Sequence, residues 1–542
     1  MRRLVMCCDG TWNTPGQLAP TNVRRLYSAL VDSATDGPDP TDGQDTTDGE
    51  IATDGREQLT RYQPGVGTVS GGLFGWLLGG AAGVGLSSDV MDAYHWLTTT
   101  YRPGDTIALF GFSRGAFTAR SLAGMIAACG LIDTTCLDEA ATWRQIRHAY
   151  QQRYRRGPDA DPSWSDGLRF TYHPEHPDRI PVDFIGVWDT VGALGVPDTL
   201  GWTNLLDPPT RYAFHNVKFN PHVRHGRHAV ALDEQRAPFT PTLWSDLEPG
   251  QDVKQVWFPG SHMDVGGGHP QTGLSDGALH WMIDESRTAI GLEFRNAVEK
   301  QIEPDPLGMV HDDNQGIYGL LEPLYEPLLR SMLEPFMEPR PRATPVIDKY
   351  ENNASLHPSV YTRHERPPIT SGPYRSTRTL APGESATVGV SARDPWNWTG
   401  LYLDVGEYAF AATGEWTDLS IASGPAGTTG WRRFHPREAF RLASTVLGQG
   451  ERLFRRVTGN PQANFLLTRR DENEPWMSLI GVVANDAIAL EGAQALHERI
   501  AIGAGTNHRV CRSGYLYAFA NDAWGFYGNN RGDVHLTVTR TQ

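Results

Sequence analysis

Short runs of mostly apolar residues recur through the first part of the chain. The runs are LVMCC (4–8), TIALF (106–110), VDFIGVWD (182–189) and VKQVWFPG (253–260). Runs of this kind are typical of strands that are buried on both faces, as in a parallel sheet covered by helices. The pattern therefore predicts an α/β domain whose sheet is mainly parallel.

Other segments show the apolar spacing of helices. They are 89–102, 116–130, which ends at a glycine, and 275–286. A Pro-Gly pair at 103–104 stops the first of these helices. The segment RHAVALDE (227–234) is ambiguous between a helix and a strand.

The pattern changes after residue 376. Five short stretches alternate apolar and polar residues between glycine turns: ATVGVSA, GLYLDV, EYAFAATG, SGYLYAFA and DVHLTVTR. They predict an all-β sandwich, which a helical insertion at 437–457 interrupts. The block 335–375 is rich in proline and charge and predicts a wrapping segment followed by a linker. We therefore expect two domains, 1–375 and 376–542.

Two segments of the first domain stand apart. Residues 34–55 hold four TDG triplets with a period of six and almost no apolar residues. Such a stretch cannot bury enough surface to order itself, so we expect a disordered acidic insertion rather than a calcium-binding repeat, whose known forms have other periods. Residues 65–86 are glycine-rich, apolar and uncharged. They predict either a mobile loop that leads into a helix or a lid that faces lipid.

Composition and charge narrow the class of protein. The 542 residues carry a net charge of −15, which argues against a general nucleic-acid binder because phosphate backbones need clustered Lys and Arg. The five cysteines have no metal-ligand spacing and require no oxidising compartment. The apolar run at the N-terminus is too short for the core of a signal peptide, and no apolar run reaches the length of a membrane helix. We expect synthesis in the cytoplasm; export by a signal-independent secretion system would leave no mark of this kind.

The pentad GFSRG (111–115) lies between a buried strand and a helix and matches the G-x-S-x-G nucleophile elbow. Its glycines are required because side chains two residues either side of Ser113 would collide with the neighbouring strand and helix. The helix directs unpaired N–H groups at the reaction centre, so the N–H of Arg114 is a natural oxyanion donor. We expect a second donor in the loop after the first strand, at Gly10 and Thr11.

A nucleophilic serine needs a base, and the base needs an acid that orients it. In this architecture both follow the serine in the chain and lie just past the ends of strands. Asp189 directly follows one apolar strand, and His262 follows another beside three glycines. Asp264 is a rival acid, but its place two residues from His262 suits a hydrogen bond to local backbone. The prediction is a Ser113–Asp189–His262 triad that needs no cofactor.

Seven motifs in order resemble the α/β-hydrolase domain of type VI secretion phospholipase effectors. They are CDGTWN (8–13), PTNVRRL (20–26), YQPGVGT (62–68), GFSRGAFTAR (111–120), VWDTVGALG (187–195), ALDEQRAPFTPTLW (231–244) and PGSHMDVGGG (259–268). The likeness covers about residues 1–370, with HPSVYTR (357–363) as its last motif. It implies an α/β-hydrolase fold and cleavage of phospholipid acyl esters, and it places the triad at the same three residues. CCDGT also resembles a haloacid-dehalogenase phosphatase motif, but Cys7 stands where the nucleophilic Asp would be.

The stretch FANDAWGFYGNNRGDVHLTV (518–537) resembles the loop with which bacterial galactophilic lectins bind calcium and sugar. Asp522, Asn529 and Asn530 offer hard oxygen ligands in one glycine-rich loop, which suits calcium. The resemblance covers about residues 376–542. The alternative is a lectin-like sandwich in which the Asn side chains only stabilise a turn.

The lectin resemblance also implies further contacts. The carbonyl of Phe526 and a carbonyl near Asp418 or Leu419 would complete the calcium shell, and Asn521 would touch sugar. Phe526 replaces a smaller polar residue of the lectin loop.

We therefore expect a serine hydrolase of carboxylic esters, foremost phospholipid acyl esters. Two alternatives stay open: an esterase for soluble or polymeric esters, and a glycan-binding adaptor with an inactive hydrolase domain. The expected partners are a lipid or ester substrate, a glycan and a membrane surface, but no nucleic acid.

Overall fold

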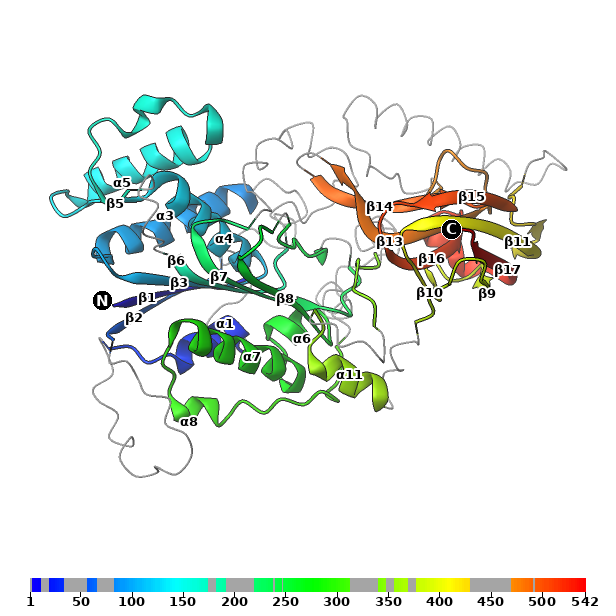
Figure 1. Cartoon of the computed structure of the whole chain (residues 1–542), viewed down its shortest axis with the longest axis horizontal. Coiled ribbons are helices and arrows are strands. Elements are labelled where there is room, and N and C mark those ends of the chain that lie inside the picture. Colours follow the sequence, from blue (N-terminus) through cyan, green and yellow to red (C-terminus); the bar gives the residue numbers. More distant parts are fainter. Residues whose placement is uncertain are drawn as a thin grey trace, which may run out of the picture.

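Figure 1 shows the computed structural model, in which a parallel α/β domain lies beside an antiparallel β domain. The structure describes residues 2–10, 19–33, 56–65, 82–173, 182–191, 219–236, 239–245, 247–311, 340–347, 355–368, 377–428, 469–490 and 493–542.

The sheet of the first domain has six parallel strands in the order β2-β1-β3-β6-β7-β8. Their bounds are β1 (Arg3–Cys8), β2 (Gln58–Gln63), β3 (Thr106–Phe112), β6 (Val182–Trp188), β7 (Val223–Ala231) and β8 (Asp252–Phe258). Every residue of β1 and β6 is buried, as their nearly unbroken apolar runs require. The predicted fold class, a mainly parallel α/β domain followed by an antiparallel β region, is confirmed.

Two strands differ from what the apolar pattern alone indicates. The ambiguous segment 227–234 lies largely in β7, so it is a strand. The pattern missed β2, because this edge strand buries only Gln58 and carries no apolar run.

Helices cover both faces of the parallel sheet (Figure 1). Those of the first domain are α1 (Asn22–Ala29), α3 (Ala82–Thr100), α4 (Arg114–Cys129), α5 (Glu139–Ala149), α6 (His262–Gly266), α7 (Gly273–Ile290), α8 (Asn296–Glu299) and α11 (Pro358–Glu365). Shorter elements are the π-helical η1 (Tyr150–Tyr154), the 3₁₀ helices η2 (Gly157–Asp159) and η3 (Pro162–Ser165), and the paired strands β4 (Leu131–Ile132) and β5 (Phe170–Tyr172). One apolar core joins the sheet to α3, α4 and α5, and a second joins its other face to α1 and α7.

The C-terminal domain packs two antiparallel sheets around one apolar core. One sheet has the order β10-β16-β13-β14, and the other has the order β12-β11-β17-β9 with β15 paired to β11. The bounds are β9 (Ser385–Ser391), β10 (Asn397–Leu403), β11 (Gly406–Asp418), β12 (Ile421–Ser423), β13 (Leu479–Leu490), β14 (Ala493–Ala501), β15 (Gly505–Val510), β16 (Gly514–Ala520) and β17 (Asn530–Arg540), with the turn η8 (Trp524–Asn529).

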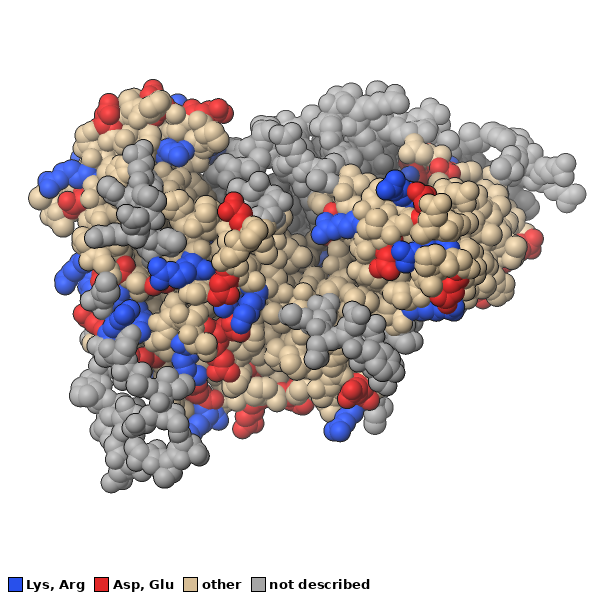
Figure 2. All heavy atoms as spheres, viewed as in Figure 1, with Lys and Arg blue, Asp and Glu red and all other residues tan. Residues whose placement is uncertain are grey.

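Several sequence predictions fall on parts of the chain that are not described. The acidic insertion at 34–55, the helical insertion at 437–457 and most of the glycine-rich segment 65–86 lie outside the described residues. None of the described helices is long and apolar enough to cross a membrane. On the face shown in Figure 2, the described basic and acidic residues are interspersed over the first domain.

Candidate active site

Ser113 occupies the sharp turn between β3 and α4. Its backbone has φ 57° and ψ −122°, a strained conformation for a residue with a side chain. A Cβ on Gly111 would lie 2.4 Å from the carbonyl oxygen of Gly115, and one on Gly115 would lie 2.2 Å from that of Cys8. The turn therefore needs glycine at both positions, for the steric reason that the pentad suggested.

Asp189 and His262 form a buried hydrogen-bonded pair, which we call the dyad. Asp189 directly follows β6, and the Ser113 N–H donates to the carbonyl of Trp188 at its end. His262 begins α6 just after β8, and its Nδ1 lies 2.6 Å from Asp189 Oδ2. The structure thus brings together the predicted acid and base at the strand ends where Ser113 also lies.

Arg342 binds the other side of the Asp189 carboxylate. Its two terminal nitrogens lie 2.7 Å from Oδ1 and 2.9 Å from Oδ2, and the N–H of Ala231 donates to Oδ1 at 2.9 Å. Burial raises the pKa of the Asp189 carboxyl, but the charge of Arg342 and the hydrogen bonds from His262 and Arg342 outweigh burial and hold that pKa well below its ordinary value. Asp189 is therefore ionised across the neutral range.

The His262 ring is held between two aromatic side chains. Its centroid lies 4.6 Å from the ring of Phe112 and 4.9 Å from that of Phe239. The backbone N–H of His262 donates to Glu234, which is itself paired with Arg236. Within the described part of the chain, no hydrogen bond joins the Ser113 hydroxyl to His262; such bonds often tighten only when substrate is bound.

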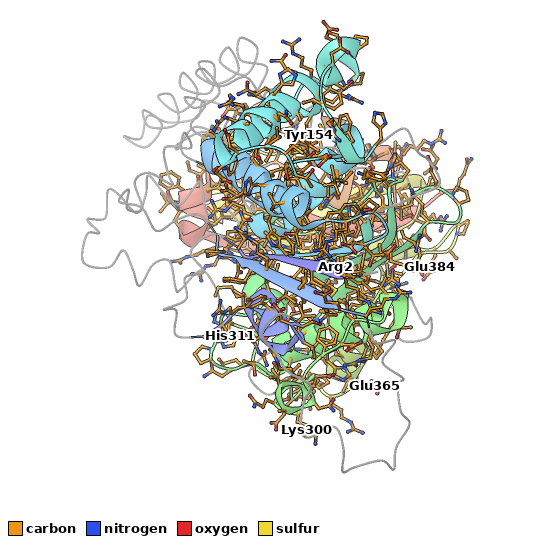
Figure 3. The ribbon with its side chains drawn as sticks, turned by 90° about the vertical axis from the view of Figure 1, so that its left-hand side faces the viewer. Arg2, Tyr154, Lys300, His311, Glu365 and Glu384 are labelled. Carbon is orange, nitrogen blue, oxygen red and sulfur yellow. The ribbon has the colours of Figure 1, made fainter. Side chains whose placement is uncertain are left out.

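Asp264 contacts Ser261 and His311 rather than the His262 ring. Its Oδ2 accepts hydrogen bonds from the Ser261 N–H and hydroxyl and from the His311 N–H, and its Oδ1 lies 2.5 Å from His311 Nδ1. Asp264, His269 and His311 place ligand-type atoms within 4.8 Å of one another, but these hydrogen bonds already occupy the carboxylate. We assign the cluster to anchoring α6, on the side of the sheet where Figure 3 labels His311.

The structure describes two of the three predicted oxyanion donors. Arg114 is the first residue of α4, where an N–H group has no partner within its helix. The N–H of Gly10 instead donates to the carboxylate of Asp9 at 2.7 Å, so in this conformation it is not free to bind an oxyanion. Thr11, the other predicted donor, lies outside the described residues.

The C-terminal loop offers buried oxygen atoms that suit a cation. Asp522 accepts a hydrogen bond from Asn530 Nδ2 at 2.8 Å, which joins two of the predicted ligands. The side-chain oxygens of Asn529 and Asn530 are buried and have no hydrogen-bond partner among the described residues. Orphaned buried oxygens are costly unless something binds them, so these residues fit Ca²⁺.

The carbonyls predicted to complete this shell lie on the neighbouring strand and turn. Asp418, the last residue of β11, pairs in register with Asn530 of β17. Leu419 then turns the chain with φ 56°. Phe526 lies within η8, between the predicted side-chain ligands.

The prediction that Asn521 touches sugar is wrong. Asn521 is fully buried, and its side-chain oxygen accepts from the N–H of Asp471 at 2.9 Å. Its amide group donates to the carbonyls of Asp471, Glu474 and Pro475. Its polar atoms therefore pin the 471–475 turn to the end of β16, which leaves none of them for a ligand.

Comparison with known proteins identifies the catalytic domain. The model of the Tle1-like catalytic domain of T6SS phospholipase effectors matches residues 2–285, just over half of the chain. The chain belongs to this family. The resemblance inferred from the seven motifs is confirmed, and the matched region contains Ser113, Asp189 and His262.

Individual relatives are more distant. The uncharacterized protein YEL023C of Saccharomyces cerevisiae is 28% identical over 257 residues, which cover 44% of this chain and 32% of the yeast protein. The structure of the Tle1 effector bound to the VgrG spike is 16% identical, with a TM-score of 0.26, over 50% of this chain and 52% of that one. The EclA N-terminal domain, a PllA-like lectin, is 19% identical, with a TM-score of 0.16, over 28% of this chain and 94% of its own. The chain thus spans about a third of the yeast relative and about half of the Tle1 chain.

Sequence reasoning missed two groups around the dyad of Asp189 and His262. Glu234 and Arg236 lie within the motif ALDEQRAPFTPTLW. An acidic and a basic residue two positions apart in this motif were the signal that could have indicated a buried pair. Arg342 lies beyond the matched region, in the block read as a wrapping segment and linker. Nothing local marks it as the partner of a residue 153 positions away.

Proposed function

We propose that the protein hydrolyses carboxylic esters of phospholipids with Ser113 as nucleophile, His262 as base and Asp189 as the orienting acid. The observation that carries this proposal is the 2.6 Å contact between His262 Nδ1 and Asp189, at the sheet edge where the strained elbow presents Ser113. Membership of the Tle1-like phospholipase family supports the same reaction class.

In the proposed mechanism, Ser113 Oγ attacks the ester carbonyl carbon while its proton moves to His262 Nε2. Asp189 accepts the hydrogen bond from Nδ1–H and stabilises the imidazolium. The Arg114 N–H stabilises the oxyanion. Collapse of the tetrahedral intermediate breaks the ester bond, and the leaving alcohol takes the proton from His262. Water then attacks the acyl-enzyme by the same route, which releases a carboxylate and restores Ser113.

A cavity of about 720 Å³ beside α4 supports an acyl-chain substrate. It lies between α4 and the segments 242–245 and 247–249, over β6 and the start of β7. Tyr154, which is labelled in Figure 3, also lines it. The lining is mostly apolar and includes Phe117, Ala127, Ile185, Phe219 and Trp244. Since a helix rises 1.5 Å per residue, Phe117 begins the cavity about 6 Å along α4 from Ser113, and the cavity continues for about 16 Å to Ala128.

The ester end of this cavity is tied to the dyad. The N–H of Thr242 donates to the carbonyl of Thr190, the residue after Asp189, at 2.8 Å. Arg120 donates to the Thr242 carbonyl from α4 and lies 5.1 Å from the Trp244 ring. We infer that an acyl chain bound to Ser113 enters beside these residues and extends along α4.

The test measures fatty acid released from phosphatidylcholine vesicles and turnover of soluble esters with short and long acyl chains. We expect Ala127→Trp, which fills the cavity, to lower the ratio of long-chain to short-chain turnover about tenfold or more. Ala297→Trp, on exposed α8, is the matched control and should leave that ratio unchanged. Cleavage of soluble esters alone would favour the soluble esterase, and no turnover on any substrate would favour the glycan-binding adaptor.

We also propose that Asp522, Asn529 and Asn530 bind Ca²⁺ in the C-terminal domain, supported by their two orphaned buried oxygens. Bound Ca²⁺ would give the side-chain oxygens of Asn529 and Asn530 a positively charged partner. We expect Ca²⁺ at a hundredfold excess over its Kd to raise the Tm of this domain by about 5–10 °C relative to EDTA. Asp522→Ala should abolish the shift, whereas Asp533→Ala, exposed on β17, should keep it. An equal Tm with calcium and with EDTA would leave only the turn-stabilising role.

Membership of the Tle1-like effector family also supports export by a type VI secretion system. We propose this route, and a membrane surface as the site of action, for the chain as a whole. Detection of the chain in the medium of secretion-competent but not secretion-deficient cells tests it.

A further inference from the structure

The segment 340–347, which we call the interdomain strap, lies between the two domains. Its residue Arg342 is buried against the catalytic domain, where it holds both oxygens of Asp189 and also donates to the carbonyls of Ala231 and Phe239. A planar guanidinium that binds a carboxylate through two nitrogens fixes the position and the plane of that carboxylate.

The two residues before Arg342 bind the other domain. Arg340 donates to the carboxylate of Asp486 and to the carbonyl of Ala495, each at 2.7 Å. His497 Nε2 lies 2.8 Å from the carbonyl of Pro341. A carbonyl only accepts, so Nε2 carries a hydrogen, and His497 Nδ1 lies 3.2 Å from the backbone nitrogen of Asp486 and 3.1 Å from its carboxylate Oδ1.

A register shift between β13 and β14 places the side chains that make these contacts. The pairing of β13 with β14 shifts register between Val483 and Ile488, and Asp486 within that stretch has φ 46°. Bulges of this kind bend a strand and redirect a side chain. Here the β13–β14 hairpin, which extends toward the catalytic domain in Figure 1, presents Asp486 and His497 to the strap.

We propose that the β-sandwich positions the catalytic dyad: the β13–β14 hairpin holds Arg340 and Pro341, and thereby sets the grip of Arg342 on Asp189. Three consecutive residues span only about 8 Å, so the sandwich contacts and the Asp189 contact cannot move independently. Arg342 is a positioning residue, since it acts on the reaction only through Asp189. The inference rests on the proposed function in one respect, the assignment of Asp189 as the triad acid.

Few other titratable or charged groups face the dyad. His228, whose Nε2 accepts from the N–H after Asp189, is neutral because burial lowers its pKa to about 3. The Glu234–Arg236 pair touches the His262 backbone, and Arg120 lies beyond His228. Loss of the Arg342 charge therefore leaves the dyad without its one directly bonded cation among the described residues.

The test compares Arg342→Gln, His497→Phe and the matched control Tyr515→Phe in the full chain. The Tyr515 hydroxyl accepts a hydrogen bond from the N–H of Ile347, which lies in the same strap five residues beyond Arg342. Its variant therefore loses a contact between the strap and the sandwich without touching the dyad. We expect kcat on a soluble ester to fall about 100-fold in Arg342→Gln and about tenfold in His497→Phe, with KM little changed. Tyr515→Phe should stay within about twofold of wild type.

Two further readouts separate positioning from stability. Removing the Arg342 charge, or weakening its contact with Asp189, favours the protonated dyad, so the acidic limb of the pH–kcat profile should move to higher pH in both Arg342→Gln and His497→Phe. The double variant should be no slower than Arg342→Gln alone, because both changes act through one contact. A lower Tm in His497→Phe with unchanged kcat and pH profile would overturn the proposal.

An NMR measurement, which does not need turnover, distinguishes a failure of positioning by the sandwich from a failure of the proposed function. The proton between His262 and Asp189 should give a low-field ¹H NMR signal in wild type, absent in His262→Ala. The signal should shift in Arg342→Gln and His497→Phe but not in Tyr515→Phe. A signal unmoved in His497→Phe would refute positioning by the sandwich even if no ester proved to be a substrate, whereas missing turnover with a shifted signal would refute only the proposed function.

Discussion

Ser113→Ala is expected to lower ester turnover by about 10⁴-fold or more while leaving the fold intact. The reason is that the acyl-enzyme of the proposed mechanism needs an oxygen at this position, and the elbow offers one side chain there. Alanine fits the same turn, and Gly111 and Gly115 still allow the close approach of β3, α4 and β1. Fatty acid release from vesicles and turnover of a soluble ester measure the loss, and circular dichroism checks the fold.

The matched control is Ser286→Ala. Ser286 is also buried, but its hydroxyl donates to the carbonyl of Ile283 within α7. Its variant should keep wild-type turnover. Residual activity in Ser113→Ala above a thousandth of wild type would mean that another nucleophile does the chemistry.

Asp189→Asn is expected to lower kcat by about 10⁴-fold, because an amide can donate to His262 Nδ1 and stabilise the wrong imidazole tautomer. It should also destabilise the protein by about 3–5 kcal/mol, since it removes the carboxylate from a fully buried ion pair and leaves the charge of Arg342 unmatched. Steady-state kinetics and urea unfolding measure the two effects.

The pH dependence of that stability difference follows from the lowered pKa of Asp189. The carboxylate is favoured in the folded state, so its stabilising effect is complete above about pH 5 and declines as the pH falls below the ordinary Asp value. The stability gap between wild type and Asp189→Asn should therefore narrow in acid.

Two further variants sharpen the assignment. Asp189→Asn combined with Arg342→Met should recover stability without recovering activity, because the unmatched charge is gone but the orienting carboxylate is still missing. Asp264→Asn should cost far less activity than Asp189→Asn, since Asp264 binds Ser261 and His311 rather than the His262 ring. A loss of equal size in Asp264→Asn would move the acid role to that residue.

Much of the fold could be predicted because a strand buried on both faces of a sheet is a continuous run of apolar residues in the sequence. β1, β3 and β6 are runs of apolar residues, and that is how they were predicted. β2 has no such run because it is an edge strand whose side chains are largely half-exposed. The positions of Ser113, Asp189 and His262 could be inferred because parallel strands end at one edge, so residues just past the strands converge there.

Predictions of ligand-binding roles from residue type alone failed where the sequence does not show whether a group is buried or already hydrogen-bonded. Asn521 looked like a ligand beside Asp522, yet its amide is used entirely by the 471–475 turn. Gly10 looked like an oxyanion donor, yet its N–H is taken by the adjacent Asp9. In both cases the competing partner was a backbone or side-chain group whose geometry no spacing rule describes.

The sequence by itself determined the fold class, the elbow at Ser113 and the strand ends that carry the dyad, because each depends on neighbours a few residues apart. Only the tertiary structure decided that Arg342 grips Asp189 and that Arg340, Pro341 and His497 tie this grip to the β-sandwich. Such contacts join residues 146 to 156 positions apart, and a buried ion pair constrains only its two ends. The chain between those ends is free to vary, so no local pattern records the contact.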